Sequence, residues 1–194
     1  MKFQVPIMDD KEGQFEGLMK PNLSRCAPPP FRDKLRRALW QAIWLILYRP
    51  SPVVLHGWRR FLLRRFGATI GTAAHPYPSS QIWAPWNLVM EARSCLGPKA
   101  NCYSAVRIVL EEDCVVSQGA HLCSASHDFR DPDFPLVTGS ITIGREAWVA
   151  AEAFIGPGVH IGHAAVVGAR TVVVRNVLPR DVVGGNPAKV IAKR

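Results

Sequence analysis

The second half of the sequence repeats every six residues. A glycine, an alanine or a valine follows each member of an aliphatic series formed by Ile143, Val149, Ile155, Ile161, Val167 and Val173. A period of six matches neither the 3.6 of an α-helix nor the 2 of a strand. It predicts an all-β solenoid in which each six-residue unit makes one short strand and one corner, and three units close a triangular coil.

The repeat also predicts where its side chains lie. The aliphatic residue should fill the interior, and the glycine that often follows it should relieve the turn at the corner. The coils should stack about 4.8 Å apart, each pairing only with its neighbours. The repeat continues upstream with a slip of two residues, through Ile82, Leu88, Met90, Leu96, Cys102, Leu110, Val116 and Leu122. In this frame Cys102 and Cys114 are apolar fillers at inward or corner positions.

One stretch interrupts the repeat. From Leu122 to Ile143 the spacing is 21 residues, which equals one 18-residue coil plus three. The sequence there reads HLCSASHDFRDPDFPLVTG, and it predicts a loop over residues 123–140 that leaves the solenoid. The loop contains His127.

The N-terminal third has a different character. Residues 1–66 hold 13 Lys and Arg against 5 Asp and Glu, a net charge of +8, whereas residues 67–194 have a net charge of only +1. Residues 1–31 lack periodicity and predict a flexible arm. Residues 32–66 predict basic amphipathic helices, interrupted by Pro50 and Pro52. These helices either pack on the main domain or make a peripheral contact with an anionic membrane.

Composition narrows the cellular setting. The five cysteines form no CxxC pair and an odd number cannot all pair within one chain, which favours a reducing cytoplasm. The longest strongly apolar run, residues 38–48, is shorter than the roughly 20 residues of a membrane-spanning helix. No helix-turn-helix, finger or RNP motif accompanies the basic charge, so we expect no nucleic-acid partner.

Four motifs in order make the sequence resemble a known family. They are APWNL at 84–88, VVSQGAHLCSASHDFRDPDF at 115–134, ITIG at 141–144 and GGNPAKVI at 184–191. Over residues 32–194 the chain resembles the hexapeptide-repeat acyltransferases, most of all the colanic-acid-type polysaccharide O-acetyltransferases related to the maltose, galactoside and nodulation enzymes. The resemblance implies a left-handed parallel β-helix over 67–194 with a C-terminal cap at 178–194. It also implies a homotrimer with active sites between subunits, and acetyl transfer from acetyl-CoA.

The resemblance assigns a catalytic residue. His127 matches the family's catalytic histidine, and histidine suits a general base because it is partly neutral at pH 7. Asp128, Arg130 and Asp131 either orient His127 or meet the acceptor, or are solvated loop charges. Ser104 lies near a position where relatives often carry asparagine, and it is a further candidate for contacting the acceptor or orienting His127. Cys123 is a weaker alternative, as a nucleophile that His127 would activate.

The resemblance also suggests how acetyl-CoA is held. Trp148, Ala151 and Ala169 match positions along the pantetheine arm, and Arg170, Arg175 and Lys189 fall near the CoA phosphates. No metal is expected, because His121, His160 and His163 do not form the three-histidine set of zinc enzymes with this fold.

The sequence therefore predicts a cytoplasmic O-acetyltransferase that is peripheral at the inner membrane face if the basic helices bind lipid. Its acceptor would be a sugar hydroxyl of an exopolysaccharide or glycolipid precursor. The alternatives are an acyltransferase with another acyl donor or an amine acceptor, and a catalytically silent trimeric β-helix scaffold.

Overall fold

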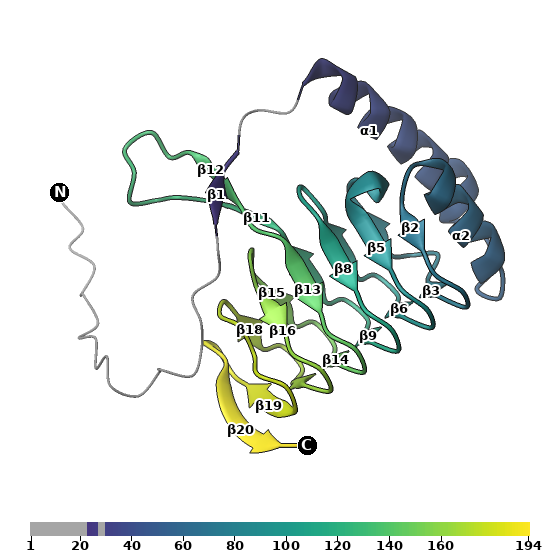
Figure 1. Ribbon diagram of the computed structural model, residues 1–194. Helices are drawn as coiled ribbons and strands as arrows, with labels where there is room; N and C mark the ends of the chain where they lie inside the picture. Colours follow the sequence, from purple (N-terminus) through teal and green to yellow (C-terminus); the bar gives the residue numbers. More distant parts are fainter. Residues whose placement is uncertain (1–22, 27–29) are drawn as a thin grey trace.

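The computed structural model describes residues 23–26 and 30–194 and is dominated by a triangular solenoid (Figure 1). The solenoid is a left-handed parallel β-helix of about 6 turns, as the resemblance implied. Three sheets form its sides, and the chain passes from the first face to the second, then to the third, and back to the first.

The strands of each face are short. The first face holds β2 (Thr69–Ile70), β5 (Leu88–Met90), β8 (Ile108–Leu110), β13 (Ile141–Ile143) and β16 (His160–Ile161). The second holds β3 (His75–Pro76), β6 (Cys95–Leu96), β9 (Val115–Val116), β14 (Trp148–Val149), β17 (Val166–Val167), β19 (Asp181–Gly184) and β20 (Lys189–Lys193). The third holds β4 (Gln81–Ile82), β7 (Asn101–Tyr103), β10 (His121–Cys123), β15 (Phe154–Ile155) and β18 (Val172–Val173).

The coil length changes along the solenoid. Ile143 pairs in register with Ile161, 18 residues on, whereas Met90 pairs with Leu110, 20 residues on. The two additional residues lie at the corner from the third face to the first, where Cys102 and Leu110 are eight apart. The 21 residues from Leu122 to Ile143 cross this same corner. The expectation that they include a whole coil is therefore wrong, because β10 and β13 are consecutive strands of the solenoid.

The corners differ from the expectation that the glycine after each inward aliphatic residue relieves the turn. A positive φ occurs three residues after the inward aliphatic, at Glu146 (57°) and Glu152 (59°), and not at the glycine directly after it. That glycine is needed for close packing between coils. A Cβ on Gly144 would lie 2.6 Å from the carbonyl oxygen of Ile161, and one on Gly162 would lie 2.4 Å from the backbone nitrogen of Pro179.

The interior of the solenoid is the hydrophobic core. The aliphatic side chains of the repeat are buried from Ile70 to Val183, and each stacks on its partner one coil away. Cys102 and Cys114 are fully buried, which confirms that they are apolar fillers. Each buried methylene stabilises the fold by about 0.8 kcal/mol, so the continuous stack is the main source of stability.

Two helices cover the N-terminal end of the solenoid. They are α1 (Phe31–Ile43), which continues as the π-helix η1 (Trp44–Tyr48), and α2 (His56–Arg65). Trp40 is buried, and its Nε1 donates a hydrogen bond to the carbonyl oxygen of Ile82 at 2.7 Å. Arg59 is also buried and donates to the carbonyl oxygen of Pro76 at 2.7 Å. One face of the helical segment thus packs on the main domain.

The remaining elements are three short strands associated with the predicted loop and one 3-10 turn. Residues 125–127 form β11 (Ala125–His127), and β12 (Leu136–Thr138) returns beside it. β1 (Ser24–Arg25) lies within the segment expected to be an arm, most of which is outside the described residues. A short 3-10 turn, η2 (Pro85–Asn87), precedes β5. In the described ranges, every helix is too short or too polar to cross a bilayer.

Candidate active site

The interruption of the repeat is an antiparallel hairpin. β11 pairs with β12 in the register Ala125 with Thr138 and His127 with Leu136. β1 adds a third strand, with Arg25 opposite Val137. The hairpin projects beyond the triangular section of the coils (Figure 1). His127 therefore stands at the end of an ordered strand and not in an irregular loop.

His127 is oriented by a single residue across the hairpin. Its Nδ1 lies 2.9 Å from the carbonyl oxygen of Phe134, and its ring stacks on the Phe134 ring with centroids 4.5 Å apart. A carbonyl oxygen can only accept a hydrogen bond, so Nδ1 carries the proton in the neutral imidazole. The lone pair is then on Nε2, and this tautomer can take a proton from a substrate hydroxyl.

A groove opens beside His127, with a volume of about 600 Å³. The hairpin contributes Ser126, His127, Asp128, Phe129, Arg130 and Val137 to it. Leu23 and Arg25 come from beside β12, and Pro157 and Val174 come from the same corner in two successive coils. The groove thus combines a candidate base with cations from Arg25 and Arg130.

The three loop charges singled out in the sequence have different surroundings. The Oδ1 of Asp128 accepts a hydrogen bond from the backbone of Arg130 at 3.1 Å, and both residues line the groove. Asp131 forms an ion pair with Arg25, which ties β1 to the hairpin. Within the described residues, His127 has its hydrogen bond to Phe134 and none to these three side chains.

The structure does not bring Ser104 to the groove. Its side chain is buried, and its hydroxyl accepts from the Ala84 backbone nitrogen at 3.1 Å and donates to the Ala84 carbonyl oxygen at 3.0 Å. The donor and acceptor capacities of the Ser104 hydroxyl are thus both satisfied inside the solenoid. Burial raises the pKa of the Cys123 thiol, whose Sγ donates to the carbonyl oxygen of Ala125 at 3.1 Å. Both features oppose a thiolate nucleophile at this position.

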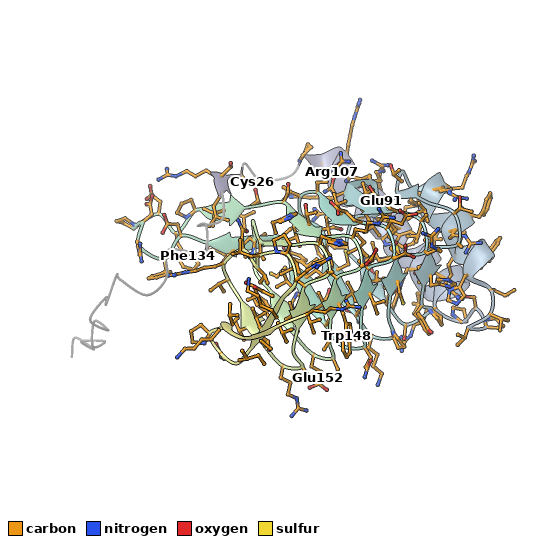
Figure 2. All side chains as sticks on the ribbon, turned by 60° about the horizontal axis from the view of Figure 1, so that its bottom comes forward. Cys26, Glu91, Arg107, Phe134, Trp148 and Glu152 are labelled. Carbon is orange, nitrogen blue, oxygen red and sulfur yellow. The ribbon has the colours of Figure 1, made fainter. Side chains whose placement is uncertain are left out.

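The six residues expected to hold acetyl-CoA divide between separate places in one chain. Trp148 lies on β14, where its Nε1 donates to Ser117 Oγ at 2.9 Å, and Figure 2 shows it near Glu152. Ala151, Ala169 and Arg170 follow at the corner from the second face to the third. Arg175 lies at the next corner, directly after the groove residue Val174, and Lys189 begins β20.

Arg170 has an acidic partner in the next coil. Its Nε lies 2.6 Å from a carboxylate oxygen of Glu152, and both side chains are exposed. The backbone nitrogen of Arg170 also donates to the carbonyl oxygen of Ala151. A phosphate that bound Arg170 would have to compete with Glu152. That competition is weak, because solvent screens an ion pair between two exposed side chains.

A second groove, absent from the sequence predictions, lies between α1 and the third face. Its volume is about 340 Å³, and it is lined by Gln41, Trp44, Gln81, Ile82, Trp83, Asn101 and Tyr103. The rings of Trp83 and Tyr103 are 5.3 Å apart. Aromatic faces and amide groups are suited to sugars, because the rings pack on C–H surfaces and the amides bond hydroxyls. Their outward positions, Trp83 directly after β4 and Tyr103 on β7, were a usable sequence signal.

No metal centre is evident in residues 23–26 and 30–194, where no three His, Cys, Asp or Glu side chains gather at ligand distance. The Nδ1 of His163 forms a hydrogen bond with the backbone carbonyl oxygen of Arg145 at 3.0 Å. His121 packs edge-on against Phe154, and burial lowers its pKa. The solenoid histidines therefore have separate local roles.

Comparison with known proteins places the chain in a family. No protein-family model matches it. A protein of Escherichia coli K12 named as a colanic acid biosynthesis acetyltransferase, WcaF, is 38% identical over 169 residues, which cover 86% of this chain and 93% of the relative. The chain belongs to the hexapeptide-repeat acetyltransferases, and within them to the colanic-acid type.

Solved structures of lower identity share the fold. A maltose O-acetyltransferase from Clostridium difficile 630 matches with a TM-score of 0.76 and 19% identity, over 84% of this chain and 89% of that one. A galactoside acetyltransferase in complex with coenzyme A matches with a TM-score of 0.74 and 19% identity, over 89% and 86% of the two chains.

Proposed function

We propose that this protein is an O-acetyltransferase that moves the acetyl group of acetyl-CoA to a sugar hydroxyl of an exopolysaccharide or glycolipid precursor. Its family makes it an acyl-CoA-dependent acyltransferase. The observation that carries the proposal is the hydrogen bond from His127 Nδ1 to the Phe134 carbonyl oxygen, because it leaves Nε2 as the proton acceptor beside an open groove.

The reaction we propose is direct transfer. His127 Nε2 takes the hydroxyl proton as the sugar oxygen bonds to the thioester carbonyl carbon. The tetrahedral intermediate then collapses and the carbon–sulfur bond breaks. His127 gives the proton to the departing sulfur, so CoA leaves as the thiol and the imidazole is neutral again. A positioned base of this kind contributes typically about 10²- to 10⁴-fold to the rate.

The substrates have candidate places. We propose that the pantetheine arm runs past Trp148, Ala151 and Ala169, and that Arg170, Arg175 and Lys189 meet the phosphates. Because these residues occupy separate corners of one chain, a single CoA would contact them all only between two subunits of a homotrimer. The groove beside Trp83 and Tyr103 is our candidate for the sugar, facing His127 of a neighbouring subunit.

The test combines binding and turnover. Calorimetry should detect CoA binding, and a thiol reagent should detect CoA release with a panel of sugars that includes amino sugars and lipid-linked saccharides. His127→Ala should lower turnover at least 100-fold. The matched control is His163→Ala, since His163 is also exposed and also bonds a backbone carbonyl through Nδ1 at 3.0 Å.

Three results would count against the proposal. Unchanged turnover of His127→Ala would remove the base role. Turnover only with amino sugars would make the protein an N-acyltransferase, and the absence of both CoA binding and CoA release would favour a scaffold. Light scattering tests the trimer independently, and a monomer with full activity would exclude a site shared between subunits.

A further inference from the structure

An apolar stripe runs along the outer side of α1 and η1. The side chains of Phe31, Leu35, Leu39 and Ile46 are 78%, 64%, 57% and 65% exposed. Their spacing of four, four and seven residues places them on one side of the helix. Soluble monomers rarely expose contiguous apolar surface of this kind, so the stripe calls for a partner.

The solenoid cannot supply that partner, because the opposite side of the helix is already fixed. Trp40 and Tyr48 are fully buried, and Trp44 donates from Nε1 to the carbonyl oxygen of Ser80 at 2.9 Å. Turning the helix to bury the stripe would break these contacts. The stripe therefore faces away from the core as a built feature of the fold.

The second helix extends the apolar surface. Trp58 and Phe61 of α2 stack with ring centroids 5.7 Å apart and are 39% and 51% exposed. Trp58 Nε1 donates to the carbonyl oxygen of Leu47 at 3.0 Å, which joins the start of α2 to η1. Val54, in the turn between the helices, is 82% exposed. An amphipathic tryptophan at the margin of such a surface is typical of a membrane interface.

The charge around the stripe indicates what covers it. From Lys34 to Met90 the sequence contains no aspartate or glutamate. Exposed cations accompany the apolar side chains: Arg32 and Lys34 on α1, Arg49 directly after η1, and Arg65 on α2. A second copy of this surface would bring like charges together, whereas an anionic bilayer complements both the cations and the apolar stripe.

We infer that the docking surface, defined as Phe31, Leu35, Leu39, Ile46, Trp58 and Phe61 with their neighbouring cations, lies in the interface of an anionic phospholipid bilayer. The stripe enters the headgroup region, and the cations contact lipid phosphates. This goes beyond the acetyl-transfer reaction, because it requires only the helices and a lipid surface.

Docking also defines the class of acceptor, and this part rests on the proposed function. Gln41 and Trp44 line the second groove from the other side of the same helix. A helix with side chains is about 10–12 Å thick, so the groove would lie about that far from the lipid surface. A saccharide linked to a lipid reaches this distance through its linking groups, which favours a lipid-linked saccharide over a free sugar.

The experiment uses the full chain and vesicles of phosphatidylcholine, with or without phosphatidylglycerol. The chain should co-sediment with the anionic vesicles, less so with neutral ones, and less at high salt. The variant Leu35→Ser/Leu39→Ser/Ile46→Ser should weaken binding at least tenfold. A matched control is Leu178→Ser/Val190→Ser/Ile191→Ser, which alters three aliphatic residues exposed elsewhere, at 44%, 49% and 67%.

The outcomes separate docking from catalysis. Sedimentation involves no acetyl transfer, so a failed enzyme assay leaves the docking result standing. The stripe variant should keep its turnover with soluble sugars and lose it with a lipid-linked acceptor in vesicles. Equal sedimentation of the wild type and the stripe variant would overturn the inference. A change of oligomeric state in the stripe variant, seen by light scattering, would overturn it in favour of a second copy.

Discussion

His127 and Phe134 make two contacts at once: their rings are stacked within 5° of parallel, and the Phe134 carbonyl oxygen lies 2.9 Å from His127 Nδ1. One contact fixes the plane of the imidazole, and the other fixes its tautomer. Phe134 has a φ of 45°, a left-handed conformation that turns its carbonyl toward the histidine. Phe134 is therefore a candidate positioning residue.

Phe134→Ala should remove the stacking and keep the carbonyl. Aromatic pairs contribute about 0.5–1.5 kcal/mol beyond their buried area, so we expect kcat to fall about 2- to 13-fold. Phe134→Tyr is the control, because it retains the ring and should retain activity. A rise in KM alone, with kcat unchanged, would show that Phe134 contacts substrate and does not position the base.

The ion pair between Arg25 and Asp131 should support the hairpin from β1. Arg25→Ala and Asp131→Ala should each lower kcat a few-fold, since partly exposed pairs contribute about 0.2–1 kcal/mol. The double variant should be no worse than either single one. Arg93→Ala breaks another pair, with Asp113 at 2.7 Å, and should leave kcat unchanged. Additive effects of the two single changes would exclude a shared role.

The glycines that follow the inward aliphatic residues should be intolerant of alanine. Gly162→Ala places a Cβ 2.4 Å from the Pro179 backbone nitrogen, and overpacking of this kind costs about 1–3 kcal/mol. We expect a lower unfolding temperature in calorimetry. Gly57→Ala is the comparison, because its Cβ would have its nearest neighbour at 3.7 Å within α2 and should stabilise the helix. Equal unfolding temperatures would show that the coils can separate locally.

The buried thiol of Cys102 should make the fold sensitive to alkali. Burial raises the pKa of Cys102 to about 12, above the roughly 8.5 of an exposed thiol. Between these values the unfolded chain ionises first and binds fewer protons, so the free energy of unfolding should fall by about 1.4 kcal/mol per pH unit. The stabilising effect is complete below about pH 8.5 and is lost as the pH rises toward 12.

Denaturant unfolding at several pH values between about 8.5 and 10.5 tests whether the free energy of unfolding falls as the pH rises. Cys102→Ala should start from a lower stability, because it leaves a small cavity, but should decline less steeply with pH. Cys26→Ala, at an exposed cysteine, should keep the wild-type slope. A slope for Cys102→Ala equal to that of the wild type would assign the alkaline loss to other groups.

The sequence alone determined the architecture, because a six-residue period requires one strand and one corner per unit wherever the chain repeats it. It also singled out His127 as a candidate base, since a titratable side chain stands out where a repeat of small and aliphatic residues breaks. The family resemblance added the handedness of the coil, which spacing cannot encode. The exposed or buried status of each repeat position followed directly from the period, as the buried Cys102 and Cys114 show.

Only the tertiary structure decided what surrounds these residues. The pairing of β1 with β12 joins Arg25 to Asp131, 106 residues away, and such contacts depend on where the chain returns in space. The burial of Ser104 inside the solenoid also depends on tertiary structure, because its hydrogen-bond partner Ala84 lies one coil earlier in the chain. The outward stripe of α1 was likewise fixed by tertiary packing: a helical period shows that one side is apolar, but the burial of Trp40 and Tyr48 determines which side remains exposed.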